Sequence, residues 1–199
     1  RNIDDPRNKL YLSVFKTLKL TNPKAFVVEN VRGLKTMWDG NVFKEIIKKF
    51  ESAGYIVTES LLNSADYGVP QIRHRVFIVG IKKELNKKFE FPKPEFDKDD
   101  YITCGEAIDN LPSLENGELK SNDYNQKPTT NYQRYVMDSN KLYNHEATLH
   151  KQFVTDTIAL VPEGGNYKDL PKGVGDSRKF NEAWTRYHSQ KPSRTIDTG

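Results

Sequence analysis

Two short polar elements, each joined to an apolar run, constrain this chain more than any other feature. The segment 29–31, Glu-Asn-Val, ends the apolar run 25–28, and the segment 71–75, Gln-Ile-Arg-His-Arg, leads directly into the apolar run 76–80. Short apolar runs rich in β-branched and aromatic residues are typical of buried strands. A strand end is a rigid support, so we expect this carboxylate and these guanidiniums to recognise a planar hydrogen-bonding ring and a phosphate.

The first 81 residues alternate helical and strand patterns. Apolar residues recur at helical spacing after Asp5-Pro6, a favourable helix start, and again over 42–50, while 55–62 is expected to be another strand. The order helix, strand, helix, strand, strand predicts an α/β layer. It is incomplete as a nucleoside-binding layer, because no Gly-rich turn follows a first strand.

The sequence changes character after Gly80. Residues 82–100 are charged and Pro-containing, which indicates a linker, and Thr103 is a candidate cap for a short helix over 103–111. A further helix is expected to carry Leu149, Phe153 and Leu160 and to end before Pro162. The remaining segments are polar and loop-rich. We therefore expect an incomplete catalytic domain over 1–81, and a linker and recognition domain over 82–199.

Composition sets broad limits on function. The chain has 199 residues, 36% of them hydrophobic, a mean hydropathy of -0.76 and a net charge of +4. No apolar run approaches the roughly 18 residues that span a membrane, and the single cysteine fits a reducing compartment. The basic excess lies in residues 1–80, which hold 13 Lys and Arg against 8 Asp and Glu. That excess is compatible with a nucleic-acid partner without establishing one.

Four elements together resemble the cytosine-5 DNA methyltransferases. The segment 26–34 resembles their Glu-Asn-Val element, 66–80 their Gln-x-Arg-x-Arg element, and 191–196 the Pro-x-x-Thr-Ile stretch that closes their target-recognition region. Asp4-Asp5-Pro6-Arg7 resembles the helix start that precedes the first of these. The resemblance implies a fold of the α/β class: a partial Rossmann-like methyltransferase layer with a smaller, loop-rich target-recognition domain.

The resemblance also implies a chemistry. In this family a Pro-Cys cysteine attacks C6 of a flipped cytosine, and C5 then takes a methyl group from S-adenosylmethionine. Glu29 matches the residue that acts at N3 of the ring, Arg75 the arginine that reaches O2, and Arg73 a supporting companion. The remaining site assignments are Gln71, Arg186, Arg194 and Thr195 for DNA binding, and Asn30 for the cofactor.

The departures from the family pattern limit this chain. No Pro-Cys pair occurs, and Cys104 lies in a segment resembling the start of the recognition region, so we expect it to be a buried small hydrophobe. We read the chain, which starts at Arg1, as a piece of a longer protein that transfers no methyl group alone. The alternative is a DNA-recognition subunit of a split enzyme whose cysteine lies on another chain; an RNA methyltransferase of the same lineage is a third reading.

Other partners follow from the same reading. We expect duplex DNA as the partner, together with the missing N-terminal part or a complementary subunit, in the bacterial cytoplasm at the nucleoid. A severed layer exposes strand edges, so self-association is expected as well. His145 and His150 lack a matched ligand set, so no metal site is expected. The cluster around Trp184, which includes Arg186, fits either base contact or a minor core.

Overall fold

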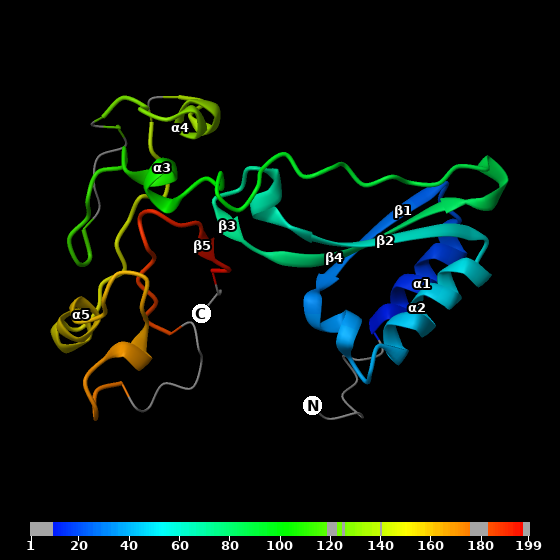
Figure 1. Ribbon diagram of the computed structural model, residues 1–199, viewed down its shortest axis with the longest axis horizontal. Coiled ribbons are helices and arrows are strands. Elements are labelled where there is room, and N and C mark those ends of the chain that lie inside the picture. The colour runs from blue at the N-terminus through cyan, green and yellow to red at the C-terminus, as the bar shows by residue number, and fades with distance from the viewer. Residues whose placement is uncertain (1–9, 119–122, 125, 140, 176–182, 197–199) are drawn as a thin grey trace. The chain divides into compact units, whose positions relative to one another are not determined.

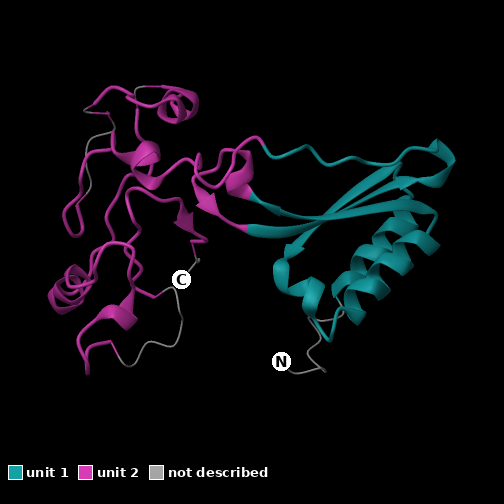
Figure 2. Cartoon of the chain, in the orientation of Figure 1, with its two compact units in different colours: residues 1–63, 74–94 teal, residues 64–73, 95–199 magenta. Residues whose placement is uncertain are grey.

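The computed structural model describes most of the chain, in two compact units. The described residues are 10–118, 123–124, 126–139, 141–175 and 183–196. Unit 1 comprises residues 1–63 and 74–94, and unit 2 comprises residues 64–73 and 95–199 (Figure 2). The chain therefore passes from unit 1 into unit 2 and back before it enters unit 2 again. The two units do not follow the division expected at residue 81, because residues 64–73 group with unit 2 and residues 82–94 group with unit 1.

Unit 1 is a three-stranded sheet with two helices on one face (Figure 1). Its elements are α1 (Leu10–Thr21), β1 (Ala25–Val31), η2 (Arg32–Thr36), α2 (Asn41–Ser52), β2 (Tyr55–Asn63), β4 (His74–Lys82) and η4 (Lys83–Leu85). The strand order is β1-β4-β2, and β4 is antiparallel to both neighbours. The outer strands β1 and β2 therefore run in the same direction, joined through α2, with β4 inserted between them.

The core of unit 1 lies between the helices and the sheet. Val76 and Ile78 of β4 are fully buried there against Phe50 of α2. Phe26 of β1 stacks at a tilt on Phe50, with ring centroids 4.8 Å apart. A Cβ at Gly80 would stand 2.1 Å from the Phe26 ring, so glycine at this position makes room for that ring. Because side chains alternate along a strand, residues 27, 29 and 31 of β1 face the opposite side of the sheet.

The α/β elements of unit 1 confirm the predicted order. The strand expected at 25–28 extends to Val31, and the other two expected strands appear as β2 and β4. The predicted helix start at Asp5-Pro6 lies outside the described residues. None of the helices in the described parts of the chain is long and apolar enough to cross a membrane.

Unit 2 consists of short elements joined by long loops. They are η3 (Ser64–Tyr67), β3 (Gln71–Ile72), α3 (Cys104–Ile108), α4 (Asn131–Val136), α5 (Gln152–Ala159), η5 (Tyr167–Asp169) and β5 (Ser193–Arg194). Thr103 caps α3 as predicted, within a capping box completed by Glu106. The predicted helix through Leu149 and Leu160 is shorter than expected, since α5 includes neither residue.

Candidate functional site

The predicted acid and arginine meet on the face of the sheet opposite the helices. Glu29 points to that face because its neighbour Val28 packs on the core. Arg75 pairs in register with Val31, two residues along β1 from Glu29, and shares the same face. The Arg75 Nε atom lies 2.9 Å from Glu29 Oε1, in an ion pair.

In this ion pair, Arg75 is held by a further hydrogen bond and Glu29 is partly exposed to solvent. Arg75 Nη1 donates to the His74 carbonyl at 2.9 Å, and the Arg75 side chain is 19% exposed. The Glu29 side chain is 47% exposed. Within the described chain, Glu29 is engaged through Oε1 alone, which leaves Oε2 for a ligand. A guanidinium has five N–H donors, so Arg75 keeps donors for a ligand as well.

Three of the predicted DNA-contact residues come together at a two-strand parallel ladder in unit 2. Gln71 pairs with Ser193, and Ile72 with Arg194. Thr195 Oγ1 donates to the Ile72 carbonyl at 3.2 Å, across 123 residues of sequence. Gln71, Arg194 and Thr195 therefore lie along one ladder.

The other two predicted arginines in unit 2, Arg73 and Arg186, lie outside the residue pairs of the β3–β5 ladder. The carbonyl of Arg73 accepts hydrogen bonds from the Ser64 N–H at 3.0 Å and the Ser64 hydroxyl at 3.2 Å, which closes the loop 64–73 at its base. Arg186 is exposed and donates from Nη1 to the Val161 carbonyl at 3.3 Å. Its main chain bonds the turn at 164–165.

A clamp on the loop 64–73 was missed by sequence reasoning. The Asp66 carbonyl accepts the N–H groups of Glu95 at 2.9 Å and Phe96 at 3.2 Å, and the Tyr101 hydroxyl donates to the Asp66 carboxylate. Gly68 has a φ of +80°, and a Cβ there would be 3.0 Å from the Phe96 ring. Phe96 of the expected linker and Tyr101, which directly follows that linker, therefore hold the loop that carries Gln71. These contacts join residues about 30 positions apart, and no periodic pattern in the sequence marks them.

A hollow of about 330 Å³ lies beside Asn30 in unit 1. Its wall is mostly apolar, and Tyr11, Glu29 and Asn30 are the residues in it with polar side-chain groups. Asn30 Oδ1 already accepts the Val31 N–H at 2.8 Å. S-adenosylmethionine carries ribose hydroxyls, an amino group and a carboxylate that all need partners. The residues present do not fit that whole molecule, so the assignment of Asn30 to the cofactor remains a proposal.

The cysteine and the histidines have structural surroundings. Cys104 is half-buried rather than buried as expected, and burial, followed by the Asp109 carboxylate, raises the pKa of its thiol. A thiol with a raised pKa is a poor nucleophile. His145 Nε2 is 2.8 Å from the Pro112 carbonyl, and the main chain of His150 bonds Asn116. Among the described residues, no three His, Cys, Asp or Glu side chains are grouped to hold a metal ion.

The surface around Arg186 contains one perturbed carboxylate. The Ser189 N–H donates to Glu163 Oε1 at 2.6 Å, and this hydrogen bond is the main cause that lowers the pKa of Glu163. His188 and Arg186 lower the same pKa further through their charge. Glu163 therefore ties the turn at 162–165 to residues 188–189.

The class of protein follows from comparison with known proteins, which identify a DNA methyltransferase. A family model described as C-5 cytosine-specific DNA methylase matches residues 1–196. The chain belongs to that family.

Two curated relatives support this membership. The chain is 37% identical over 194 residues to the type II methyltransferase M1.HphI of Haemophilus parahaemolyticus, covering 96% of this chain and 45% of the relative. It is 37% identical over 213 residues to the type II methyltransferase M.DdeI of Desulfomicrobium norvegicum, covering 98% and 51%. The chain thus spans about half the length of these relatives.

A solved structure shares the fold. The crystal structure of a prophage-encoded DNA modification methyltransferase of E. coli aligns over 96% of this chain and 58% of its own, with a TM-score of 0.69 and 20% identity. The described α/β layer is therefore that of the Rossmann-like DNA methyltransferases.

Proposed function

We propose that the protein containing this chain is a DNA (cytosine-5-)-methyltransferase of a type II restriction-modification system. It flips a cytosine out of duplex DNA and transfers a methyl group from S-adenosylmethionine to C5. The observation that carries this proposal is the Glu29–Arg75 pair, 2.9 Å apart on the open face of the sheet. Family membership and the type II relatives support the reaction class.

The pair suits a cytosine ring. Glu29 Oε2 meets the N3 edge, where a proton or a strong hydrogen bond neutralises the charge that develops when C6 is attacked. The same carboxyl group accepts from the exocyclic amine. Arg75 uses Nε to hold Glu29 and Nη1 to hold the His74 carbonyl, and its other N–H groups reach cytosine O2. Arg73 supports Arg75 because its carbonyl closes the base of the loop 64–73, two residues before Arg75.

Unit 2 is proposed to read the DNA. Gln71, Arg194 and Thr195 lie on the β3–β5 ladder, and exposed Arg186 adds a separate cationic contact. Such residues combine phosphate contacts, which weaken with salt, with contacts to base edges in the major groove. The setting proposed for this activity is the bacterial cytoplasm, at the nucleoid.

The chain alone is proposed to be inactive. Its sequence has no Pro-Cys pair, and the Asn30 hollow does not fit the methyl donor. A split enzyme, with the cysteine on another subunit, would share this property. Genomic sequence upstream of Arg1 separates the two: an in-frame Pro-Cys segment indicates one protein, and a stop codon with a neighbouring gene indicates a split enzyme.

The test is transfer of a tritiated methyl group to DNA. The full-length protein is expected to label cytosine C5 in duplex DNA and to leave tRNA unlabelled, while the 199-residue chain labels neither. Labelling of tRNA in preference to DNA would contradict the DNA assignment. Labelling of DNA by the isolated chain would contradict the proposed inactivity.

A further inference from the structure

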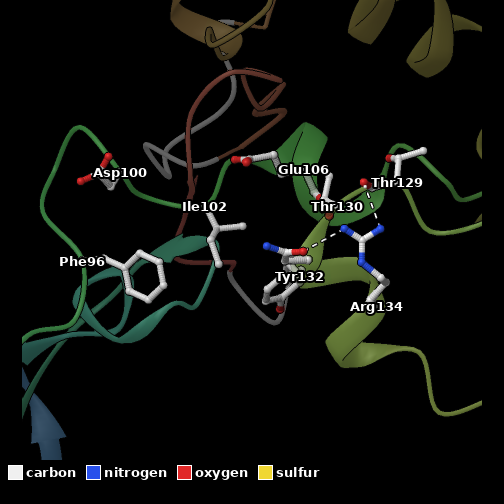
Figure 3. Close-up of a pocket in the computed structure, with 9 residues that line it drawn as sticks. Phe96, Asp100, Ile102, Glu106, Thr129, Thr130, Tyr132 and Arg134 are labelled. Atoms are coloured by element: carbon white, nitrogen blue, oxygen red, sulfur yellow. Dashed lines mark hydrogen bonds between the residues drawn. The ribbon is translucent and has the colours of Figure 1, made fainter.

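A second cavity is lined by residues of unit 2 alone. It has a volume of about 500 Å³, within the range of roughly 300–1,000 Å³ typical of ligand sites (Figure 3). Its lining comes from the segment 96–102, from α3 and from the start of α4. The lining residues are Phe96, Asp100, Ile102, Glu106, Thr129, Thr130, Asn131, Tyr132 and Arg134.

One wall of this cavity is held by a dense set of hydrogen bonds. Gln133 Oε1, on a side chain that is 1% exposed, accepts the Thr129 N–H at 2.8 Å, the Thr129 hydroxyl at 3.2 Å and the Thr130 N–H at 3.4 Å. The Thr130 hydroxyl donates to the Glu106 carbonyl at 2.7 Å and so joins α4 to α3. The wall is therefore organised before any ligand arrives, which lowers the entropic cost of binding.

Arg134 supplies a cation at one end of the cavity. Its guanidinium donates to the Pro128 carbonyl at 3.4 Å, to the Thr129 carbonyl at 3.3 Å and to Asn131 Oδ1 at 2.8 Å, all neutral acceptors (Figure 3). Among the described residues, no carboxylate lies within ion-pair distance of Arg134. Its charge is therefore not neutralised by the described residues, and a planar guanidinium held in place suits a phosphate.

The remainder of the cavity combines apolar side chains with carboxylates. Phe96 and Tyr132 contribute aromatic rings and Ile102 an aliphatic side chain, while Asp100 lies well away from Arg134 in the close-up (Figure 3). Glu106 uses Oε2 to accept the Thr103 N–H at 2.9 Å, which leaves Oε1 for a ligand. Aromatic faces stack bases, and a carboxylate accepts from the exocyclic amine of cytosine or adenine.

We propose that this cavity is a nucleotide pocket that takes one unstacked, amine-bearing nucleotide of the bound DNA, with its phosphate on Arg134 and its amine on Glu106. The pocket is additional to the Glu29 site, which belongs to unit 1, and the proposal rests on the proposed DNA function. Occupancy would also bear on the loop 64–73, because Phe96 packs against Gly68 and its N–H bonds the Asp66 carbonyl.

The test uses the 199-residue chain and free nucleotides. Nuclear magnetic resonance titration with dCMP is expected to shift the amides of 96–102 and 129–134, separately from shifts at the Glu29 site, which also suits cytosine. The affinity for dCMP is expected to be about tenfold higher than for dTMP, which offers a carbonyl where cytosine has its amine. Deoxycytidine, which lacks the phosphate, is expected to bind more weakly than dCMP.

Two variants assign the contacts. Glu106→Gln keeps an acceptor for the α3 cap and is expected to remove the preference for dCMP over dTMP. Arg134→Gln is expected to remove the difference between dCMP and deoxycytidine. Lys87→Gln removes an exposed cation in unit 1 and is the matched control, expected to bind dCMP as the parent chain does.

Several results would overturn the pocket. They are equal affinities for dCMP and dTMP, shifts confined to residues outside the cavity, and no binding of dCMP. Because these measurements use the unmodified chain, they hold even where a variant fails to fold. Methylation of duplex DNA by the full-length protein is scored separately, so a failed pocket with active methylation leaves the proposed function intact.

Discussion

The Glu29 carboxylate is the residue on which the proposed chemistry depends. Glu29→Gln in the full-length protein keeps the shape of the side chain and its acceptor for Arg75 but removes the acid. The methyl-transfer rate is expected to fall by about 10²–10⁴-fold, the usual contribution of a positioned general acid. The measurement is single-turnover tritium transfer to duplex DNA.

The control for this substitution lies on the same sheet. Glu59 pairs with Lys35 at 2.6 Å and, like Glu29, is partly exposed. Glu59→Gln removes one ion pair and is expected to leave the rate unchanged. Equal losses in both variants would show that the sheet, and not the acid at Glu29, was disturbed.

The Glu163 carboxylate gives a prediction in pH. Its pKa is lowered in the folded chain from the ordinary 4.5, mainly by the Ser189 N–H. A lowered pKa means that the contact stabilises the fold above pH 4.5 and is lost as the pH falls through the folded value. The Ser189 amide resonance is expected to titrate with a midpoint below 4.5.

Glu163→Gln is the check on that assignment. The amide side chain does not titrate, so the Ser189 transition is expected to disappear. A Ser189 transition that persists in this variant would assign the titration to another group.

At the scale of elements, Gly80 sets how closely β1 packs across β4. Gly80→Ala places a Cβ 2.1 Å from the Phe26 ring, which is held between Phe50 and Tyr55 with centroids 4.8 Å and 5.0 Å away. We expect a loss of about 1–3 kcal/mol in the free energy of unfolding, typical of overpacking. Denaturant unfolding measures it.

A double variant separates the clash from other effects of the added methyl group. Phe26→Leu replaces the ring by a smaller side chain. Its loss in the free energy of unfolding is therefore expected to be smaller in the Gly80→Ala background than in the parent chain. Simple additivity of the two losses would contradict the clash.

The Asp66–Tyr101 contact is predicted to hold the loop 64–73. Tyr101→Phe removes this hydrogen bond, and we expect a loss of about 0.5–1.5 kcal/mol in local stability. Hydrogen exchange at the Glu95 and Phe96 amides, which bond the Asp66 carbonyl, should accelerate. Tyr143→Phe, at a 70% exposed tyrosine, is the matched control and should leave these amides protected.

The elements also show what sequence could and could not predict. The strands of unit 1 and the Thr103 cap were predictable because their signals are local: short apolar runs and a capping box. The insertion of β4 between β1 and β2 was not, since strand order depends on pairing between distant segments. The Glu29–Arg75 contact came from the family resemblance. The clamp at Asp66 and the β3–β5 ladder join segments up to 123 residues apart, and no periodicity marks them.

At the scale of the whole molecule, the outer edge of β1 is a surface for association. β1 is an edge strand of the described sheet, and Val27 and Val31 are 65% and 51% exposed. Unpaired strand edges with exposed apolar residues promote pairing between chains. We expect the isolated chain to self-associate with rising concentration in sedimentation velocity.

A charged substitution tests that surface. Val27→Lys is expected to reduce the association, because a lysine on an edge strand opposes pairing. Leu160→Lys adds the same charge at a 59% exposed position in unit 2 and is expected to leave association unchanged. A reduction by both variants alike would point to net charge instead of the β1 surface.

Residues 64–73 belong to unit 2 but lie in sequence between two segments of unit 1. This arrangement limits how DNA specificity can be exchanged between relatives. A chimaera spliced at a single junction near residue 94 would keep its own β3 beside a foreign β5, and the ladder that aligns Gln71 with Ser193 would be mismatched. A sound exchange needs three junctions, at 63/64, 73/74 and 94/95. Recombination that shuffles recognition regions is therefore expected to carry the short loop along with the long segment.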